Sequence, residues 1–258
     1  MDEKTVRALN AINRSFYGEM AEAFSVTRRA PWPGWTRLPP LLRTHHPDGE
    51  LAVLDVGCGN GRFGAYLADA LPLARTRLHY HGLDASEALL ATLRARALPF
   101  AEVETIRSDL IETPIAETLG PRSFALVAAF GFLHHVPAER NRTELLRALA
   151  AKLAPGGLLA FAVWRFEAFE RFRVRERPWA EHNSRSDEPI LEDQLEAGDR
   201  LLPWGEDGRA VRYCHFANDA EVERWLAALP LDIVARYDAD GREGGLNRYF
   251  VLRMKGAA

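Results

Sequence analysis

The sequence predicts a doubly wound α/β fold, built on a mainly parallel sheet of seven strands with an antiparallel last strand. Between Leu51 and Trp164, short apolar runs alternate with segments of helical periodicity, and strands separated by helices pair in parallel. The first apolar run ends in a glycine-rich turn. Two later apolar runs, 231–238 and 248–254, follow each other closely, as an antiparallel pair does.

The alternating region contains five predicted strands. They are expected at residues 51–57, 78–84, 100–109, 123–130 and 157–164. The run at 123–130 is the most apolar, which is typical of a strand buried on both faces.

Each of the intervening helices has an apolar face. Helical spacing joins Phe63, Leu67 and Leu71 in the first helix. Ser86 is a predicted N-cap for the second helix, which carries Leu89, Leu90 and Leu93. In the segment after Pro137, spacing joins Leu146, Leu149 and Leu153, and Pro155-Gly156-Gly157 is expected to end that helix.

The chain is predicted to be one domain, 1–258, with three parts around its core. Residues 1–50 form an N-terminal lid that is first helical and then rich in proline. Residues 51–164 are the core, and 165–212 are an insertion without clear periodicity. Residues 213–258 hold the closing strand pair and a helix begun by a capping box, Asn218 and Glu221.

Composition limits the class of protein. Of 258 residues 47% are hydrophobic and 27% charged, which excludes wholesale disorder. The net charge of −3 requires any nucleic-acid contact to use a local basic patch. Two isolated cysteines suit a reducing compartment, and no apolar run reaches the roughly 18–20 residues that span a bilayer. We expect a soluble cytoplasmic protein without a membrane segment.

A glycine loop follows the first strand, and acids lie at successive strand ends. Gly57, Gly59 and Gly61 permit a tight turn with close backbone approach to a ligand. Their spacing departs from the Gly-x-Gly-x-x-Gly of dinucleotide sites. Asp84 ends the second strand, where an acid accepts hydrogen bonds from ribose hydroxyls, and Asp109 ends the third.

Over residues 51–164 this order resembles the class I S-adenosylmethionine (SAM) methyltransferases, whose fold is Rossmann-like. The resemblance implies SAM as cofactor, with Asp55 near its amino group and Asp84 on its ribose. Asp109 and the Leu110 amide would meet the adenine. The implied cofactor-binding residues also include the loop and its neighbours, Gly57, Cys58, Gly59, Asn60, Gly61, Ala85 and Phe130.

Two adjacent histidines follow the fourth strand, in the sequence FGFLHHVP, where this family has its substrate-facing motif. At a helix start, His134 and His135 point in different directions, so we expect one to face the cleft and the other to pack. A histidine here is more often structural than catalytic.

The flanking segments resemble the eukaryotic wobble-uridine tRNA methyltransferases, which form the methyl ester of 5-carboxymethyluridine at tRNA position 34. The N-terminal pattern consists of Tyr17, Ala21, Phe24, Ser25, Thr27, Arg28, Pro31, Trp32 and Pro33. Three further matches follow in order: Val163-Trp164, Leu202-Pro203-Trp204 and Arg212-Tyr213-Cys214-His215-Phe216. The resemblance implies a tRNA substrate and a small activator subunit as possible partner, and Tyr17 is counted among the SAM-binding residues.

The predicted catalytic residues follow from a carboxylate as the methyl acceptor. A carboxylate with a pKa near 4 is already ionised at neutral pH, so the cleft needs cations and hydrogen-bond donors rather than a general base. The candidates are Arg28, His134, His135, Arg212 and Tyr213.

The insertion leaves the substrate open. Its arginines from Arg165 to Arg177 are interleaved with Phe166, Phe169, Phe172 and Trp179, as in platforms for single-stranded nucleic acid. The same pattern also fits a solvated helix with internal ion pairs. The alternatives are therefore a methyltransferase for a small acid or hydroxylated metabolite, and a non-catalytic SAM-binding subunit. No metal site is predicted, because no set of histidines and cysteines has ligand spacing.

Overall fold

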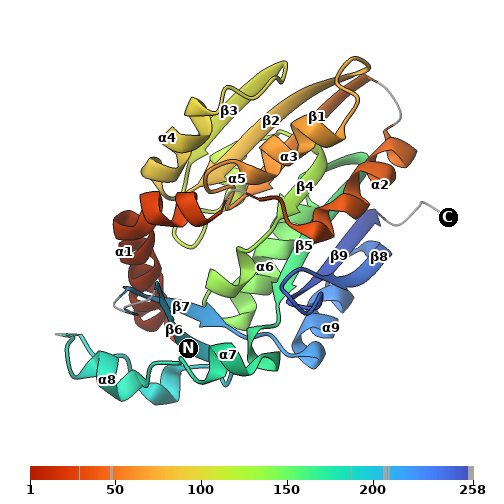
Figure 1. Ribbon diagram of the computed structural model, residues 1–258. Helices are drawn as coiled ribbons and strands as arrows, with labels where there is room; N and C mark the ends of the chain where they lie inside the picture. The colour runs from red at the N-terminus through yellow and green to blue at the C-terminus, as the bar shows by residue number, and fades with distance from the viewer. Residues whose placement is uncertain (29, 47–48, 187, 206–207, 209, 255–258) are drawn as a thin grey trace.

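The computed structural model describes residues 1–28, 30–46, 49–186, 188–205, 208 and 210–254 (Figure 1). Seven strands form one sheet in the order β3-β2-β1-β4-β5-β9-β8. The last strand, β9, runs antiparallel to both of its neighbours, and the remaining pairs in the sheet are parallel. The predicted fold class is confirmed. The strands are β1 Gly49–Val56, β2 Thr76–Asp84, β3 Glu102–Arg107, β4 Phe124–Ala129, β5 Leu153–Trp164, β8 Leu231–Ala239 and β9 Asn247–Met254.

Helices cover both faces of this sheet (Figure 1). Apolar side chains of α2 Leu38–His45, α3 Arg62–Ala70 and α4 Glu87–Ala95 pack on one face. Those of α5 Ile115–Leu119, α6 Glu139–Ala150 and α9 Asp219–Ala227 pack on the other. The predicted caps are present, since Ser86 accepts from the Leu89 N–H and Asn218 from the Glu221 N–H. Among the described residues no helix is both long and apolar enough to cross a membrane.

One helix boundary differs from the prediction. Helix α6 ends at Ala150, and Leu153 begins β5 opposite Phe124. The register between β4 and β5 shifts after Phe124, which admits Pro155-Gly156-Gly157 into the strand as an irregularity. A strand irregularity can include a proline, which has no N–H to donate to the neighbouring strand, and a glycine at positive φ.

The insertion contains structure that its sequence did not reveal. It begins with short helical turns and then forms a two-stranded antiparallel hairpin across the predicted boundary at residue 212. Leu202 lies opposite Arg212 in that hairpin, so two separate sequence motifs become neighbours. The elements are η3 Phe166–Ala168, α7 Glu170–Arg173, α8 Trp179–Asn183, η4 Glu192–Gln194, β6 Asp199–Trp204 and β7 Ala210–His215.

The lid is the long helix α1, Glu3–Thr27, followed by the 3₁₀ turn η1, Pro33–Arg37. It lies beside the hairpin β6–β7 (Figure 1). Asn13 of α1 accepts from the backbone N–H of Tyr213, at 2.9 Å. The lid and the insertion therefore form one joined cover.

A buried charge network fastens the hairpin to the helices beneath. The fully buried Arg142 of α6 donates to Glu221 of α9 at 2.7 Å and to Glu196 at 2.5 Å. His215 of β7 donates from its two ring nitrogens to Asp199, at 2.7 Å, and to Glu221, at 2.9 Å. Since each nitrogen faces a carboxylate, His215 is held as an imidazolium.

This network predicts a pH-dependent contribution to stability. Burial by itself would lower the pKa of His215, but its hydrogen bonds to Asp199 and Glu221 outweigh burial and raise the pKa. A raised pKa in the folded state stabilises the fold below the unfolded value of about 6.5, and this contribution is lost as pH rises through the folded pKa. The difference in unfolding free energy between the natural protein and His215→Gln should therefore be largest near pH 6 and shrink towards pH 9. Urea unfolding across this range measures it. A difference independent of pH would contradict a charged His215.

Candidate functional site

One large cavity lies at the carboxyl ends of β1, β2, β3 and β4, where the strand order reverses. Its volume is about 1160 Å³. Ligand pockets of roughly 300–1,000 Å³ are usual, so this cavity has room for a cofactor and part of a second substrate. The lid, the hairpin β6–β7 and the loop after β8 complete its walls.

The glycine loop forms the floor of this cavity. Gly57, Gly59 and Gly61 have φ angles of 68°, 54° and 74°, a region that favours glycine. A Cβ at Gly59 would meet only Leu89, at 4.0 Å, and would otherwise fill open space beside Asp84. Gly61 is the exception, because it does not line the cavity. A Cβ there would come within 2.2 Å of Leu93, so Gly61 serves the packing of α3 on α4.

Acids at the strand ends complete a nucleoside site. The Asp84 carboxylate accepts from the backbone N–H groups of Gly59 and Ser86, each at 2.8 Å, which fixes its orientation. Asp109 accepts from the Asn10 side chain at 2.8 Å and from the Ile111 N–H at 3.0 Å. The other cavity-lining residues of the predicted set are Tyr17, Cys58, Asn60, Ala85, Leu110 and Phe130. Oriented carboxylates and an open glycine turn fit the ribose and adenine of SAM.

Asp55 lies beneath the loop and is 2% exposed. Burial raises its pKa to about 7, while a hydrogen bond from the Tyr80 hydroxyl opposes the rise. Burial thus favours the protonated form of this carboxyl, and a ligand cation beside it would favour the ionised form.

His135 is a fixed neutral side chain. Its Nδ1–H donates to the Tyr213 carbonyl at 2.9 Å, so its Nε2 accepts from the Tyr17 hydroxyl at 2.8 Å. Burial and the nearby charge of Arg212 lower its pKa to about 3. With both nitrogens engaged, His135 joins the lid, the turn η2 (Leu133–His135) and β7, and it is a poor proton acceptor.

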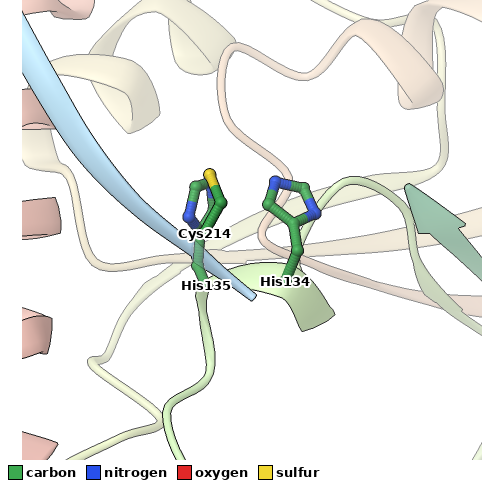
Figure 2. A group of neighbouring side chains, drawn as sticks. All are labelled: His134, His135 and Cys214. Carbon is green, nitrogen blue, oxygen red and sulfur yellow. The ribbon is translucent and has the colours of Figure 1, made fainter. Parts of the chain in front are cut away.

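His134 faces a different environment. Figure 2 shows its imidazole beside that of His135, with Cys214 of β7 next to His135. The donor atoms of these three residues lie within 4.8 Å of one another. Metal ligation through His135 Nε2 would displace the Tyr17 hydroxyl, and ligation through Nδ1 would displace the hydrogen bond to the Tyr213 carbonyl. The Nδ1 of His134 is buried without a partner among the described residues, and burial lowers the pKa of this side chain well below its usual value.

Three buried or half-buried arginines of the cavity have no carboxylate within ion-pair distance among the described residues, and the same holds for the exposed Arg175 and Arg242. Arg212 is 7% exposed, its guanidinium lies 5.1 Å from the Trp164 ring centre, and its Nε has no partner. Burial and the charge of Arg212 lower the pKa of Arg28. The pKa of Arg62 is lowered to about 10 by burial and by Arg28. Arg28 is thus close enough to both other arginines for their charges to act on one another, while Asp55 and Asp240 act on Arg62 in the opposite direction.

Tyr213 does not belong to the site as predicted. It is fully buried outside the cavity lining, and its hydroxyl donates to Asp199 at 2.7 Å. Strand alternation explains the error, because neighbouring side chains in β7 point to opposite faces and only Arg212 faces the cavity.

Several lining residues were not among the predicted site residues. They are Asn10, Arg14, Arg62, Trp164, Trp204, Arg242 and Asn247, contributed by segments distant in the sequence. The signals that could have found three of them were the position of Arg62 directly after the glycine loop and the motifs that contain Trp164 and Trp204.

Comparison with known proteins agrees with this site. A methyltransferase domain model matches residues 54–159. Mouse tRNA (carboxymethyluridine(34)-5-O)-methyltransferase ALKBH8 is 30% identical over 151 residues, which cover 58% of this chain and 19% of that protein. The corresponding yeast enzyme, from Saccharomyces cerevisiae, is 28% identical over 151 residues, covering 58% of this chain and 47% of that protein. The matched region is thus less than half of either relative.

The fold has close counterparts among solved structures. A SAM-dependent methyltransferase from Methanosarcina mazei superimposes with a TM-score of 0.60 at 18% identity, covering 84% of this chain and 98% of that one. The core of the chain, residues 54–159, thus matches a methyltransferase domain, and its fold is shared with a SAM-dependent methyltransferase, so the chain resembles the class I SAM-dependent methyltransferases. Within that class it resembles the tRNA carboxymethyluridine methyltransferases.

The site predicts the effect of removing the ribose acceptor. Asp84→Ala leaves two backbone N–H groups and the ribose hydroxyls without their partner, so SAM affinity should fall by about 1–3 kcal/mol. Isothermal calorimetry measures it, with Asp69→Ala as a control outside the described cavity lining. Unchanged SAM affinity in the Asp84 variant would disprove this assignment.

Proposed function

We propose that the protein methylates a carboxylate oxygen, and that the acceptor is the carboxymethyl group of a modified wobble uridine in tRNA. The observation that carries the proposal is the group of Arg28, Arg62 and Arg212 in one cavity, each without a carboxylate at ion-pair distance among the described residues. Uncompensated buried cations are costly unless a ligand supplies negative charge.

Charge counting favours an anionic acceptor. SAM brings a sulfonium, an ammonium and one carboxylate, so its binding adds positive charge to a cavity that already has an excess. The described lining has seven arginines and four aspartates, so the one carboxylate of SAM leaves an excess of positive charge that favours a second anion. A planar guanidinium matches a carboxylate with two parallel hydrogen bonds, and Arg212 has an unpartnered donor for such a contact.

The described side chains suit a reaction governed by positioning. The methyl donor is an electrophilic sulfonium, and an ionised carboxylate attacks it without loss of a proton. The residues must hold the attacking oxygen in line with the methyl carbon and the sulfur of SAM, and they must exclude water. Neutral His135 and His134 add no further positive charge beside Arg212, and the Trp164 ring against Arg212 limits its movement.

The relatives support tRNA as the carrier of the carboxylate, because the mouse and yeast proteins are both named for carboxymethyluridine 34. Arg175 lies at the same cavity, next to α7, and has no carboxylate at ion-pair distance among the described residues, whereas Arg171 is paired with Glu243. Phosphate groups next to the modified base would meet this side.

A specific observation favours a small-molecule acid as second candidate. The aromatic residues of the insertion are turned inward: Phe166 is 1% exposed, and Phe172 packs edge-on against Trp164, at 5.2 Å between ring centres. They do not form the exposed stacking surface expected for a single strand. With a small acid, the same arginines would bind the free carboxylate.

Nucleoside analysis of a deletion strain tests the function directly. Without the gene, mass spectrometry of digested tRNA should show loss of a uridine methyl ester and gain of the free carboxymethyl nucleoside. The natural gene should reverse the change, and a gene carrying Asp84→Ala should not. An unchanged wobble nucleoside would reject tRNA as substrate.

A transfer assay separates the two candidates. Labelled methyl groups should appear on tRNA that carries 5-carboxymethyluridine and not on the same tRNA with plain uridine. Mild alkali should release the label as methanol, since esters hydrolyse and N-methyl groups do not. Equal labelling of the free nucleoside would favour the small-molecule reading, and alkali-stable label would exclude carboxylate methylation.

Arg212 is expected to hold the acceptor. The substitution Arg212→Lys keeps the positive charge but removes the planar guanidinium that can form two parallel hydrogen bonds with a carboxylate. The kcat/KM for the acceptor should therefore fall about 10- to 100-fold. SAM affinity should stay within about twofold, and Arg173→Lys on the exposed side of α7 is the matched control. An equal loss of SAM affinity would move Arg212 to the cofactor end.

A further inference from the structure

The first residue of α3, Arg62, has a side chain with no assigned role. It lines the cavity directly after the glycine loop, and one nitrogen donates to the Ala30 carbonyl at 3.2 Å. Its guanidinium lies 5.0 Å from the ring centre of Trp32 and 5.2 Å from that of Trp35. A guanidinium has five N–H donors, so most of them remain for a ligand.

The strand order gives the direction in which SAM extends. Asp109 follows β3, Asp84 ends β2 and the glycine loop follows β1, and these strands are successive neighbours in the sheet. A ligand with adenine at Asp109 and ribose at Asp84 continues across β1, one strand spacing of about 4.8 Å further. Its amino-acid end therefore reaches the start of α3, where Arg62 lies.

The same end of the cavity suits an anion for a second reason. Helix α3 has nine residues, and Gly61 at its N-cap offers no side-chain acceptor to the free backbone N–H groups. A helix N-terminus favours negative charge. Arg28 is close enough for its charge to act on Arg62, and Asn60 links the loop to the lid through the Arg28 carbonyl, at 3.5 Å.

We propose that Arg62 binds the carboxylate of the methionine part of SAM, and that the protein thereby selects SAM over its decarboxylated form. Arg28 is close enough to Arg62 and to Arg212 for their charges to act on one another. The aromatic rings of Trp32 and Trp35 hold the guanidinium in the plane that a carboxylate needs. The inference rests on SAM as cofactor and is independent of the acceptor.

Binding of two ligands by calorimetry tests this role without turnover. The probes are S-adenosylhomocysteine and its decarboxylated analogue, which differ only in the carboxylate. The natural protein should prefer the carboxylated ligand about 10- to 100-fold, as expected for a charge-assisted pair. Arg62→Met keeps an apolar stem over the tryptophans and should reduce the preference to about twofold or less, with little change for the decarboxylated ligand.

Two controls keep the outcome decisive. Arg43→Met removes an exposed arginine of α2 and should retain the full preference. Adenosine binding reports whether the nucleoside site of each variant is intact. A full preference in Arg62→Met, or an equal loss of affinity for both ligands, would overturn the proposal. If the preference for the carboxylated ligand were lost only in Arg28→Met, the carboxylate of SAM would be assigned to Arg28. None of these results depends on the methyl acceptor, so the proposed function stands or fails separately.

Discussion

The buried pairing of Arg142 with Glu221 is the interaction on which the substrate side of the molecule depends. A fully buried guanidinium persists only with carboxylates around it, and Glu221 in turn holds His215 of the hairpin. Through His215 and Asp199 the network reaches both strands of the hairpin. The position of Arg212, three residues before His215, follows from this anchoring rather than from local sequence preference.

The lid is held by polar contacts at the same junction. Tyr17 and Asn13 of α1 bond to His135 and to the Tyr213 backbone, so the lid, η2 and β7 meet at one imidazole. Each of these groups has its partner within the protein. Helix α1 therefore closes the cavity as part of the folded structure, and its Arg28 end is brought to the glycine loop through Asn60.

The cavity itself combines satisfied and unsatisfied groups. Asp84 and Asp109 are oriented by hydrogen bonds, while Arg28, Arg62, Arg212 and the Nδ1 of His134 have donors or acceptors to spare. Folding elsewhere in the protein supplies the free energy that keeps these groups together. The nucleoside end of the cavity is acidic, whereas the arginines give the other end a positive charge that favours carboxylates.

The sequence by itself determined the sheet, the glycine loop and the acids at the strand ends, because apolar periodicity and positive-φ turns are local properties. It also located the helix caps at Ser86 and Asn218, which act over three residues. It did not reveal the hairpin β6–β7, whose strands have six residues each and no regular alternation of polar and apolar side chains, and it misassigned Tyr213, whose face depends on register. Sequence motifs singled out Arg28 and Arg212, but the tertiary structure added Arg62 and brought the three together, since they lie on the lid, on β7 and on α3. Long-range burial and charge, which no local pattern encodes, bring them to one cavity.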